Sequence, residues 1–101
     1  MSGITTHVLD TSRGRPGAGI AVELWQGDAL RHATRTDADG RARLADAIEP
    51  GTYRIVFKIG AYFPDGFYPE ATITFQVRDA AQHYHVPLLV SPFGYSTYRG
   101  S

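Results

Sequence analysis

The 101-residue sequence contains no cysteine, so neither disulfide bonds nor thiol chemistry can contribute to its fold or function. Ten Lys and Arg residues balance ten Asp and Glu residues, which gives a formal net charge of zero at pH 7. This balance argues against a nucleic-acid partner, which normally requires a basic excess. The sequence contains no run of about 18 apolar residues, the length that a membrane-spanning helix needs. Its first residues lack the basic and apolar regions of a signal peptide. We therefore expect one cytoplasmic domain, residues 1–101, with no nucleic-acid or membrane partner.

An apolar period typical of amphipathic helices is also missing. Apolar and polar residues instead alternate in short runs that are separated by Gly, Pro and Asp, which is the pattern of half-buried strands. Eight strands are predicted, over residues 4–10, 20–25, 29–36, 41–44, 53–59, 71–77, 83–90 and 94–100. Only the gap between Ile59 and Ala71 is long enough for a short helical turn. Eight short strands at this spacing are typical of an all-β sandwich or barrel.

The alternation of side chains along a strand predicts which histidines face the core. Because alternate residues share a face, His7 lies on the side of Thr5 and Leu9, while His83 and His85 lie opposite Tyr84, Val86, Leu88 and Val90. The latter set is the better core face, so the three histidines are expected to point away from the core. An apolar surface would then be exposed in a monomer, formed by Leu9, Pro87, Leu89 and Tyr98. Such a surface on a chain without net charge favours association of subunits around a polar pocket.

Each candidate residue also has a simpler interpretation. His7 and His85 could be hydrogen-bonded interface residues, and His83 with His85 could bind zinc because both face one way. No carboxylate or thiol neighbour completes a zinc site, so we expect no metal. His32 matches no motif and is expected on a solvated strand. Arg41 could be an exposed arginine after a turn.

Three segments carry a more specific signal. They are Thr5-Thr6-His7-Val8-Leu9-Asp10, His83-Tyr84-His85-Val86-Pro87-Leu88-Leu89 and Tyr98-Arg99-Gly100-Ser101. In order and spacing they resemble the transthyretin-like family, specifically its 5-hydroxyisourate hydrolase branch, over nearly the whole chain. The resemblance implies a transthyretin-like (prealbumin-like) sandwich of two four-stranded sheets with at most one short helix. It also implies a homotetramer that needs no cofactor.

The same resemblance implies a hydrolase acting on a small molecule, 5-hydroxyisourate. Its catalytic residues would be His7, Arg41, His85 and Ser101, and its substrate contacts would come from His7, Arg41 and Tyr98. Arg41 is favoured over Arg43 because it follows Gly directly in an Asp-Gly-Arg element, but Arg43 shares its strand face and stays a candidate. Which histidine is the general base is open, with a preference for His7, and His83 is placed around the site rather than in it.

Two other functions remain open from the sequence. A non-enzymatic transthyretin-like carrier of a small ligand would not need the His, Arg, His set or the Tyr-Arg-Gly-Ser end. A structural or adhesive sandwich module would not need them either.

Overall fold

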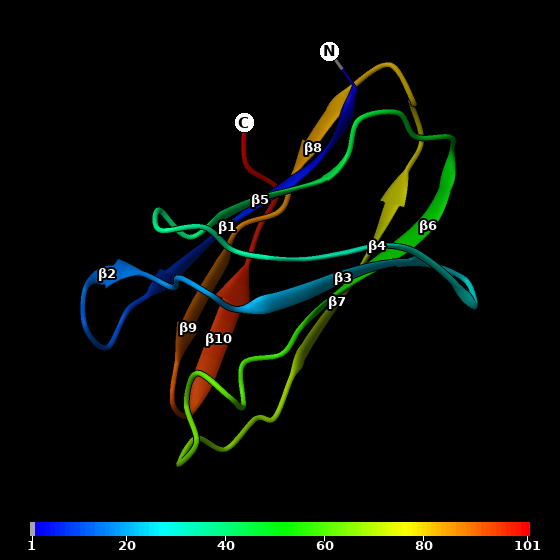
Figure 1. Ribbon diagram of the computed structural model, residues 1–101. Helices are drawn as coiled ribbons and strands as arrows, with labels where there is room; N and C mark the ends of the chain where they lie inside the picture. Colours follow the sequence, from blue (N-terminus) through cyan, green and yellow to red (C-terminus); the bar gives the residue numbers. More distant parts are fainter. Residues whose placement is uncertain (1) are drawn as a thin grey trace.

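The computed structural model describes residues 2–101, which form ten strands and no helix (Figure 1). The larger sheet contains β1 (Gly3–Asp10), β2 (Arg15–Pro16), β5 (Arg41–Ala45), β8 (His83–His85), β9 (Leu88–Ser91) and β10 (Gly94–Thr97). The smaller sheet has the order β4-β3-β6-β7, formed by β3 (Ala21–Gln26), β4 (Ala29–Arg35), β6 (Gly51–Phe57) and β7 (Ala71–Val77). The two sheets enclose one core, which confirms the predicted all-β sandwich. Within residues 2–101 there is no helix of the length and apolar character that a membrane crossing requires.

The eight predicted strands are all present, and one of them is interrupted. Residues 83–90 form β8 and β9, which are separated by Val86 and Pro87, because proline has no N–H to donate to a sheet. With β8 and β9 counted as one strand, each sheet has four main strands, and the two-residue β2 is an addition that the sequence did not predict. The segment between β6 and β7 turns without forming a helix.

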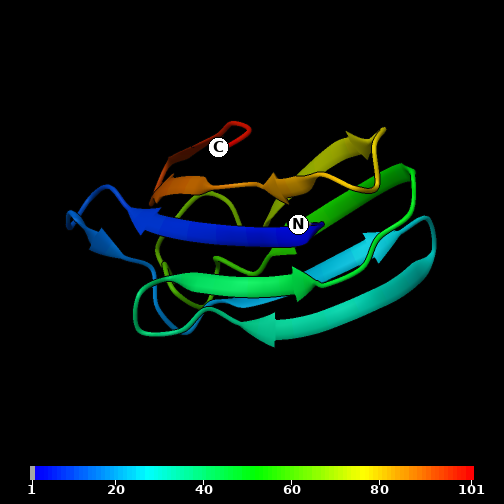
Figure 2. The same ribbon diagram turned by 90° about the horizontal axis from the view of Figure 1, so that it is seen from above.

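Strand β1 occupies the centre of the larger sheet. It pairs in parallel with β8 and β9 on one side and antiparallel with β5 on the other (Figure 2). Three segments that are far apart in the sequence are therefore adjacent in space along β1.

The core lies between the sheets and confirms the predicted side-chain alternation. Its fully buried members from β1 and β9 include Ile4, Val8, Leu88 and Val90, and those from the smaller sheet include Val22, Leu24, Ile55 and Phe57. Thr6 is also buried, and its hydroxyl donates a hydrogen bond of 2.6 Å to the carbonyl of Val86. His7, His83 and His85 are half-buried on the opposite side of their strands.

The predicted exposed apolar surface is correct in part. Leu9 and Tyr98 are 36% and 60% exposed and Leu89 is half-buried, but Pro87 is buried, so its prediction was wrong. The chain after β9 folds back over Pro87. The Thr97 hydroxyl donates to the Pro87 carbonyl at 2.7 Å, and the Gly100 N–H donates to the His85 carbonyl at 2.8 Å.

Candidate active site

The ladder between β1 and β5 places two arginines beside the residues of β1. Arg41 lies directly opposite His7, and Arg43 lies opposite Thr5. In an antiparallel pair, opposite residues project to the same face of the sheet. The side chains of both arginines therefore project from the face of the sheet that carries the histidines.

The turn before β5 fixes the backbone of Arg41. The Asp37 carboxylate accepts hydrogen bonds from the N–H groups of Asp39, at 2.9 Å, and of Arg41, at 3.0 Å. The bond from Arg41 is the main cause that lowers the pKa of Asp37. Gly40 has a φ of +76°, and a side chain there would collide with the Val8 carbonyl, so the turn can dock on β1 only with glycine.

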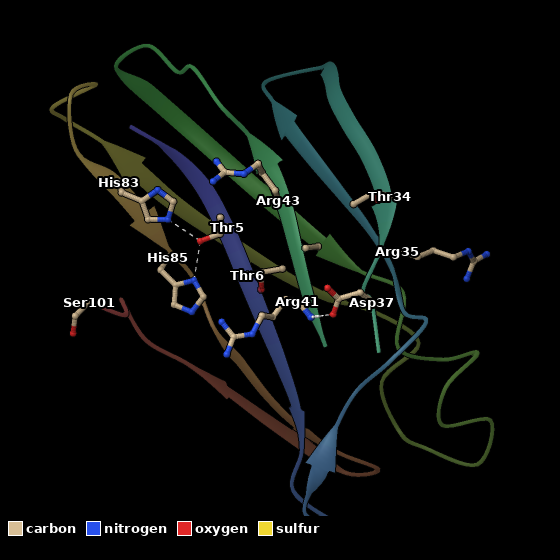
Figure 3. Close-up of a pocket in the computed structure, with 11 residues that line it drawn as sticks. Thr5, Thr6, Thr34, Arg35, Asp37, Arg41, Arg43, His83, His85 and Ser101 are labelled. Carbon is tan, nitrogen blue, oxygen red and sulfur yellow. Dashed lines mark hydrogen bonds between the residues drawn. The ribbon is translucent and has the colours of Figure 1, made fainter. Parts of the chain in front are cut away.

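The parallel pairing of β1 with β8 builds a second polar group. Thr5 lies opposite His85, and its Oγ1 is 2.9 Å from Nδ1 of His85 and 2.8 Å from Nε2 of His83 (Figure 3). The other ring nitrogen of His83, Nδ1, is 3.3 Å from the carbonyl oxygen of Ser2. One threonine hydroxyl thus joins two histidine rings.

The chain after β10 holds His85 from another side. Gly100 forms a bridge with His85, and a Cβ atom at Gly100 would lie only 2.6 Å from Cδ2 of the imidazole. Only glycine allows this segment to approach the ring so closely. Its path brings Ser101 to the same cavity as His85.

These groups surround a cavity of about 600 Å³, a size typical of small-molecule sites (Figure 3). Its lining consists mainly of threonine, arginine and histidine side chains, and includes Thr5, Thr34, Arg35, Asp37, Arg41, Arg43, His83, His85 and Ser101. Three of the four residues predicted to be catalytic, Arg41, His85 and Ser101, therefore meet at one cavity. The fourth, His7, lies next to it, opposite Arg41, and its Nε2 is 2.9 Å from the Asp39 carbonyl oxygen.

The surroundings of His85 favour a neutral ring. Burial lowers the pKa of His85, and electrostatic interactions with His7, His83 and Arg41 lower it further. A neutral imidazole has one nitrogen that can accept a proton. In residues 2–101, no group of three or more histidine, aspartate or glutamate side chains is arranged to hold a metal ion.

The structure distinguishes the two candidate arginines. Arg43 is already engaged, because its Nη1 is 3.0 Å from Oδ1 of Asp46. No hydrogen bond or ion pair within the described residues 2–101 engages the guanidinium of Arg41. Both side chains line the cavity, but that of Arg41 is free to bind a ligand.

Two other residues named in the sequence analysis lie outside the cavity. Tyr98, predicted to contact substrate, does not line it, and instead contributes to a smaller cavity of about 270 Å³ with Phe75 and Val86. His32 is exposed on β4, as expected for a solvated strand residue.

Sequence reasoning missed the connecting roles of Thr5 and Asp37. The alternation pattern had placed Thr5 on the face of His7, but only the parallel register with β8 shows that it reaches His83 and His85. The Asp37 side chain belongs to a turn that the sequence did predict, and its contact with the Arg41 backbone follows from the turn geometry.

Comparison with known proteins identifies the family. Residues 4–100 match the HIUase/Transthyretin family. The chain belongs to this family. The match includes the pair of Arg41 and His7, the group of Thr5, His83 and His85, and the segment up to Gly100. It confirms the resemblance seen in the three sequence segments.

Individual family members agree with this assignment. The chain is 46% identical to a 5-hydroxyisourate hydrolase of Caulobacter vibrioides, with 100% of both chains covered. It is also 46% identical to an Arabidopsis thaliana protein named uric acid degradation bifunctional protein TTL, in which it spans 37% of the length. The solved structure of Klebsiella pneumoniae 5-hydroxyisourate hydrolase superimposes with a TM-score of 0.92 at 34% identity, again covering both chains fully.

Proposed function

We propose that the protein is a hydrolase that opens the six-membered ring of 5-hydroxyisourate, giving 2-oxo-4-hydroxy-4-carboxy-5-ureidoimidazoline in urate breakdown. The observation that carries the proposal is the meeting of Arg41, His85 and Ser101 at one cavity, in a chain that matches a 5-hydroxyisourate hydrolase over its full length. The cavity is large enough for a bicyclic purine derivative.

Ring opening requires water to attack a ring carbonyl carbon. A neutral histidine accepts one proton from the water as its oxygen bonds to that carbon. The carbon–nitrogen bond of the ring then breaks, and the leaving ring nitrogen takes up a proton. The product therefore carries a new carboxyl group and a ureido group, and contains the atoms of substrate and water together.

Arg41 is suited to stabilise the charge that develops on the attacked oxygen. A guanidinium group is permanently charged and presents several N–H donors in a rigid plane. Directed at a developing oxyanion, such donors lower the barrier more than they strengthen substrate binding. His7 lies opposite Arg41 and is placed to exchange a proton in the same reaction.

We further propose that the enzyme is a cytoplasmic homotetramer. The exposed side chains of Leu9 and Tyr98 lie in β1 and just after β10, two strands of the sheet that carries the site. Association through this sheet would cover both residues and would bring Tyr98 of one subunit toward substrate in a shared channel.

A carrier function is the alternative, because the family also includes transthyretin. A carrier needs a site that matches its ligand and has no use for an unengaged arginine beside a neutral histidine. The polar lining of the cavity favours the enzyme.

The test generates the substrate from urate with urate oxidase and follows the ultraviolet absorbance of 5-hydroxyisourate. The enzyme should accelerate its decay well beyond the spontaneous rate. His7→Ala and His85→Ala should each lose about 10²–10⁴-fold in rate, while the exposed His32→Ala serves as a matched control with full activity. A spontaneous rate of decay in the presence of the wild-type protein would overturn the proposal.

A further inference from the structure

The hydrogen bonds around Thr5 determine where the protons of two histidines lie. They begin at the carbonyl oxygen of Ser2, which can only accept a hydrogen bond. The nitrogen that faces it, Nδ1 of His83, must therefore carry a proton. When His83 is neutral, its other nitrogen, Nε2, has a lone pair and no proton.

The Thr5 hydroxyl transmits this constraint to His85. Its single proton points to Nε2 of His83, the acceptor 2.8 Å away. The Thr5 oxygen is then left to accept, and Nδ1 of His85, at 2.9 Å, must donate to it. A neutral His85 consequently has its proton on Nδ1 and its lone pair on Nε2.

We propose that Thr5 and His83 are positioning residues that hold His85 in the tautomer with an unprotonated Nε2, which makes His85 the general base. This inference rests on the proposed hydrolase function. Within residues 2–101, no protein group forms a hydrogen bond with Nε2 of His85, so this nitrogen is available to water in the cavity. Figure 3 shows the Thr5 hydroxyl between the two rings.

His7 is held in a different way. Its Nε2 faces the carbonyl oxygen of Asp39 at 2.9 Å and must donate to it, so that nitrogen cannot accept a proton from water. The unprotonated nitrogen of a neutral His7 is then Nδ1, but His7 does not line the cavity, whereas His85 does. We therefore assign the base to His85 rather than to His7, the residue that the sequence analysis preferred.

Two further observations support a fixed ring at His85. The backbone of Gly100 packs against the imidazole and leaves no space for a side chain. Burial, together with electrostatic interactions with His7, His83 and Arg41, lowers the pKa of His85, which favours the neutral form that has a tautomer to select.

Nuclear magnetic resonance of protein labelled with ¹⁵N in histidine tests the tautomer directly. Spectra are recorded at pH 8, where an ordinary histidine with a pKa of about 6.5 is neutral. The signals of His85 are identified by their loss in His85→Gln. We expect Nδ1 of His85 to be protonated and Nε2 to be unprotonated, and the opposite pattern in the wild type would overturn the proposal.

Thr5→Val removes the hydroxyl and keeps the shape of the side chain, whereas Thr5→Ser keeps the hydroxyl. Thr5→Val should release the tautomer of His85 and lower kcat by at least about tenfold with little change in KM, since a wrong histidine tautomer is costly in general-base catalysis. Thr5→Ser should keep both the His85 tautomer and the wild-type kcat. The matched control is Thr74→Val, at an exposed position on β7. An unchanged tautomer and kcat in Thr5→Val would overturn the proposal.

His83→Phe tests the other end of the chain of bonds. Without an acceptor at position 83, the Thr5 proton is free to turn to Nδ1 of His85, which would place the ring proton on Nε2. We expect that tautomer in the spectrum, together with a fall in kcat like that of Thr5→Val. If the wild-type protein shows the expected tautomer but no turnover, the proposed function fails and the assignment of the protons still holds.

Discussion

Arg41 and Arg43 differ in what already binds them. Arg43 is held by Asp46, whereas the guanidinium of Arg41 is unengaged within residues 2–101 and lies opposite His7. Arg41→Lys should therefore reduce kcat/KM by at least about tenfold more than Arg43→Lys, because an ammonium group cannot reproduce the planar set of donors. Steady-state rates of the two variants decide this, and a larger loss in Arg43→Lys would assign the role to the other arginine.

The pH dependence of the reaction should reflect His85. The charged and titratable groups that act on it are His7 on β1, His83 on β8 and Arg41 on β5, and together with burial they lower its pKa. As pH falls, His85 remains neutral to below the ordinary histidine pKa of about 6.5, and then loses its function as a base. The acid limb of kcat/KM should therefore lie below that value and should move upward in Arg41→Gln, which removes one positive charge. An acid limb above 6.5 in the wild type would contradict a neutral, base-competent His85.

At the scale of elements, the end of β1 is tied to the long connection between β6 and β7. The side chain of Asp10 is fully buried and accepts hydrogen bonds from the Ser12 hydroxyl, at 2.6 Å, and from the Tyr62 hydroxyl, at 2.9 Å. Asp10→Ala leaves these donors without their buried partner and should lower the free energy of unfolding by about 1–3 kcal/mol. Urea denaturation measures the loss, with the exposed Asp65→Ala as control. Equal stability of the two variants would show that the contact contributes nothing.

The same carboxylate should make stability depend on acid pH. Burial raises the pKa of Asp10, but the hydrogen bonds from Ser12, Tyr62 and the backbone of Arg13 outweigh it and lower the pKa overall. A pKa lower in the folded than in the unfolded protein means that the contribution is complete above about 3.9 and is lost as pH falls through the folded value. The gap in stability between wild type and Asp10→Ala should therefore narrow below about pH 4 in denaturation measured at several pH values.

The segment after β10 borders the candidate active-site cavity, and residues added beyond it should disturb catalysis. Gly100 packs on His85, and Ser101 lines the cavity. A hexahistidine extension after Ser101 would have to pass through or over this cavity and should severely reduce activity. The same extension at the N-terminus is the comparison, because Ser2 does not line the cavity and only its backbone carbonyl, which an extension leaves in place, contacts His83. Equal rates for both tagged proteins would remove Ser101 from the site.

The alternation of side chains within strands was sufficient to predict most of the fold and the side of the sheet that the histidines face. It placed Tyr84, Leu88 and Val90 in the core and the histidines outside, because a period of two depends only on local geometry. It could not predict that Pro87 would be covered, since that depends on the path of the segment around Gly100. Nor could it predict the link from Thr5 to His83 and His85, because the parallel register of β1 and β8 is set by packing between distant segments.

At the scale of the whole molecule, the exposed Leu9 and Tyr98 predict self-association. We expect a homotetramer at micromolar concentration, with about four times the monomer mass of 11.1 kDa in light scattering. The zero net charge offers no electrostatic opposition to it. A monomeric mass in ordinary buffer would exclude a channel shared between subunits.

The parallel pairing of β1 with β8 has a consequence for how the protein acquires activity. Thr5 meets His85 across 80 positions of sequence, and Gly100 joins them later still. During synthesis, β1 therefore cannot pair with β8 until nearly the entire chain has been made. Contacts of such long range also slow folding, because the chain entropy is lost before the contacts are gained. Nascent and truncated chains should thus lack the reactive centre entirely, and activity should arise in a single late step rather than in increments.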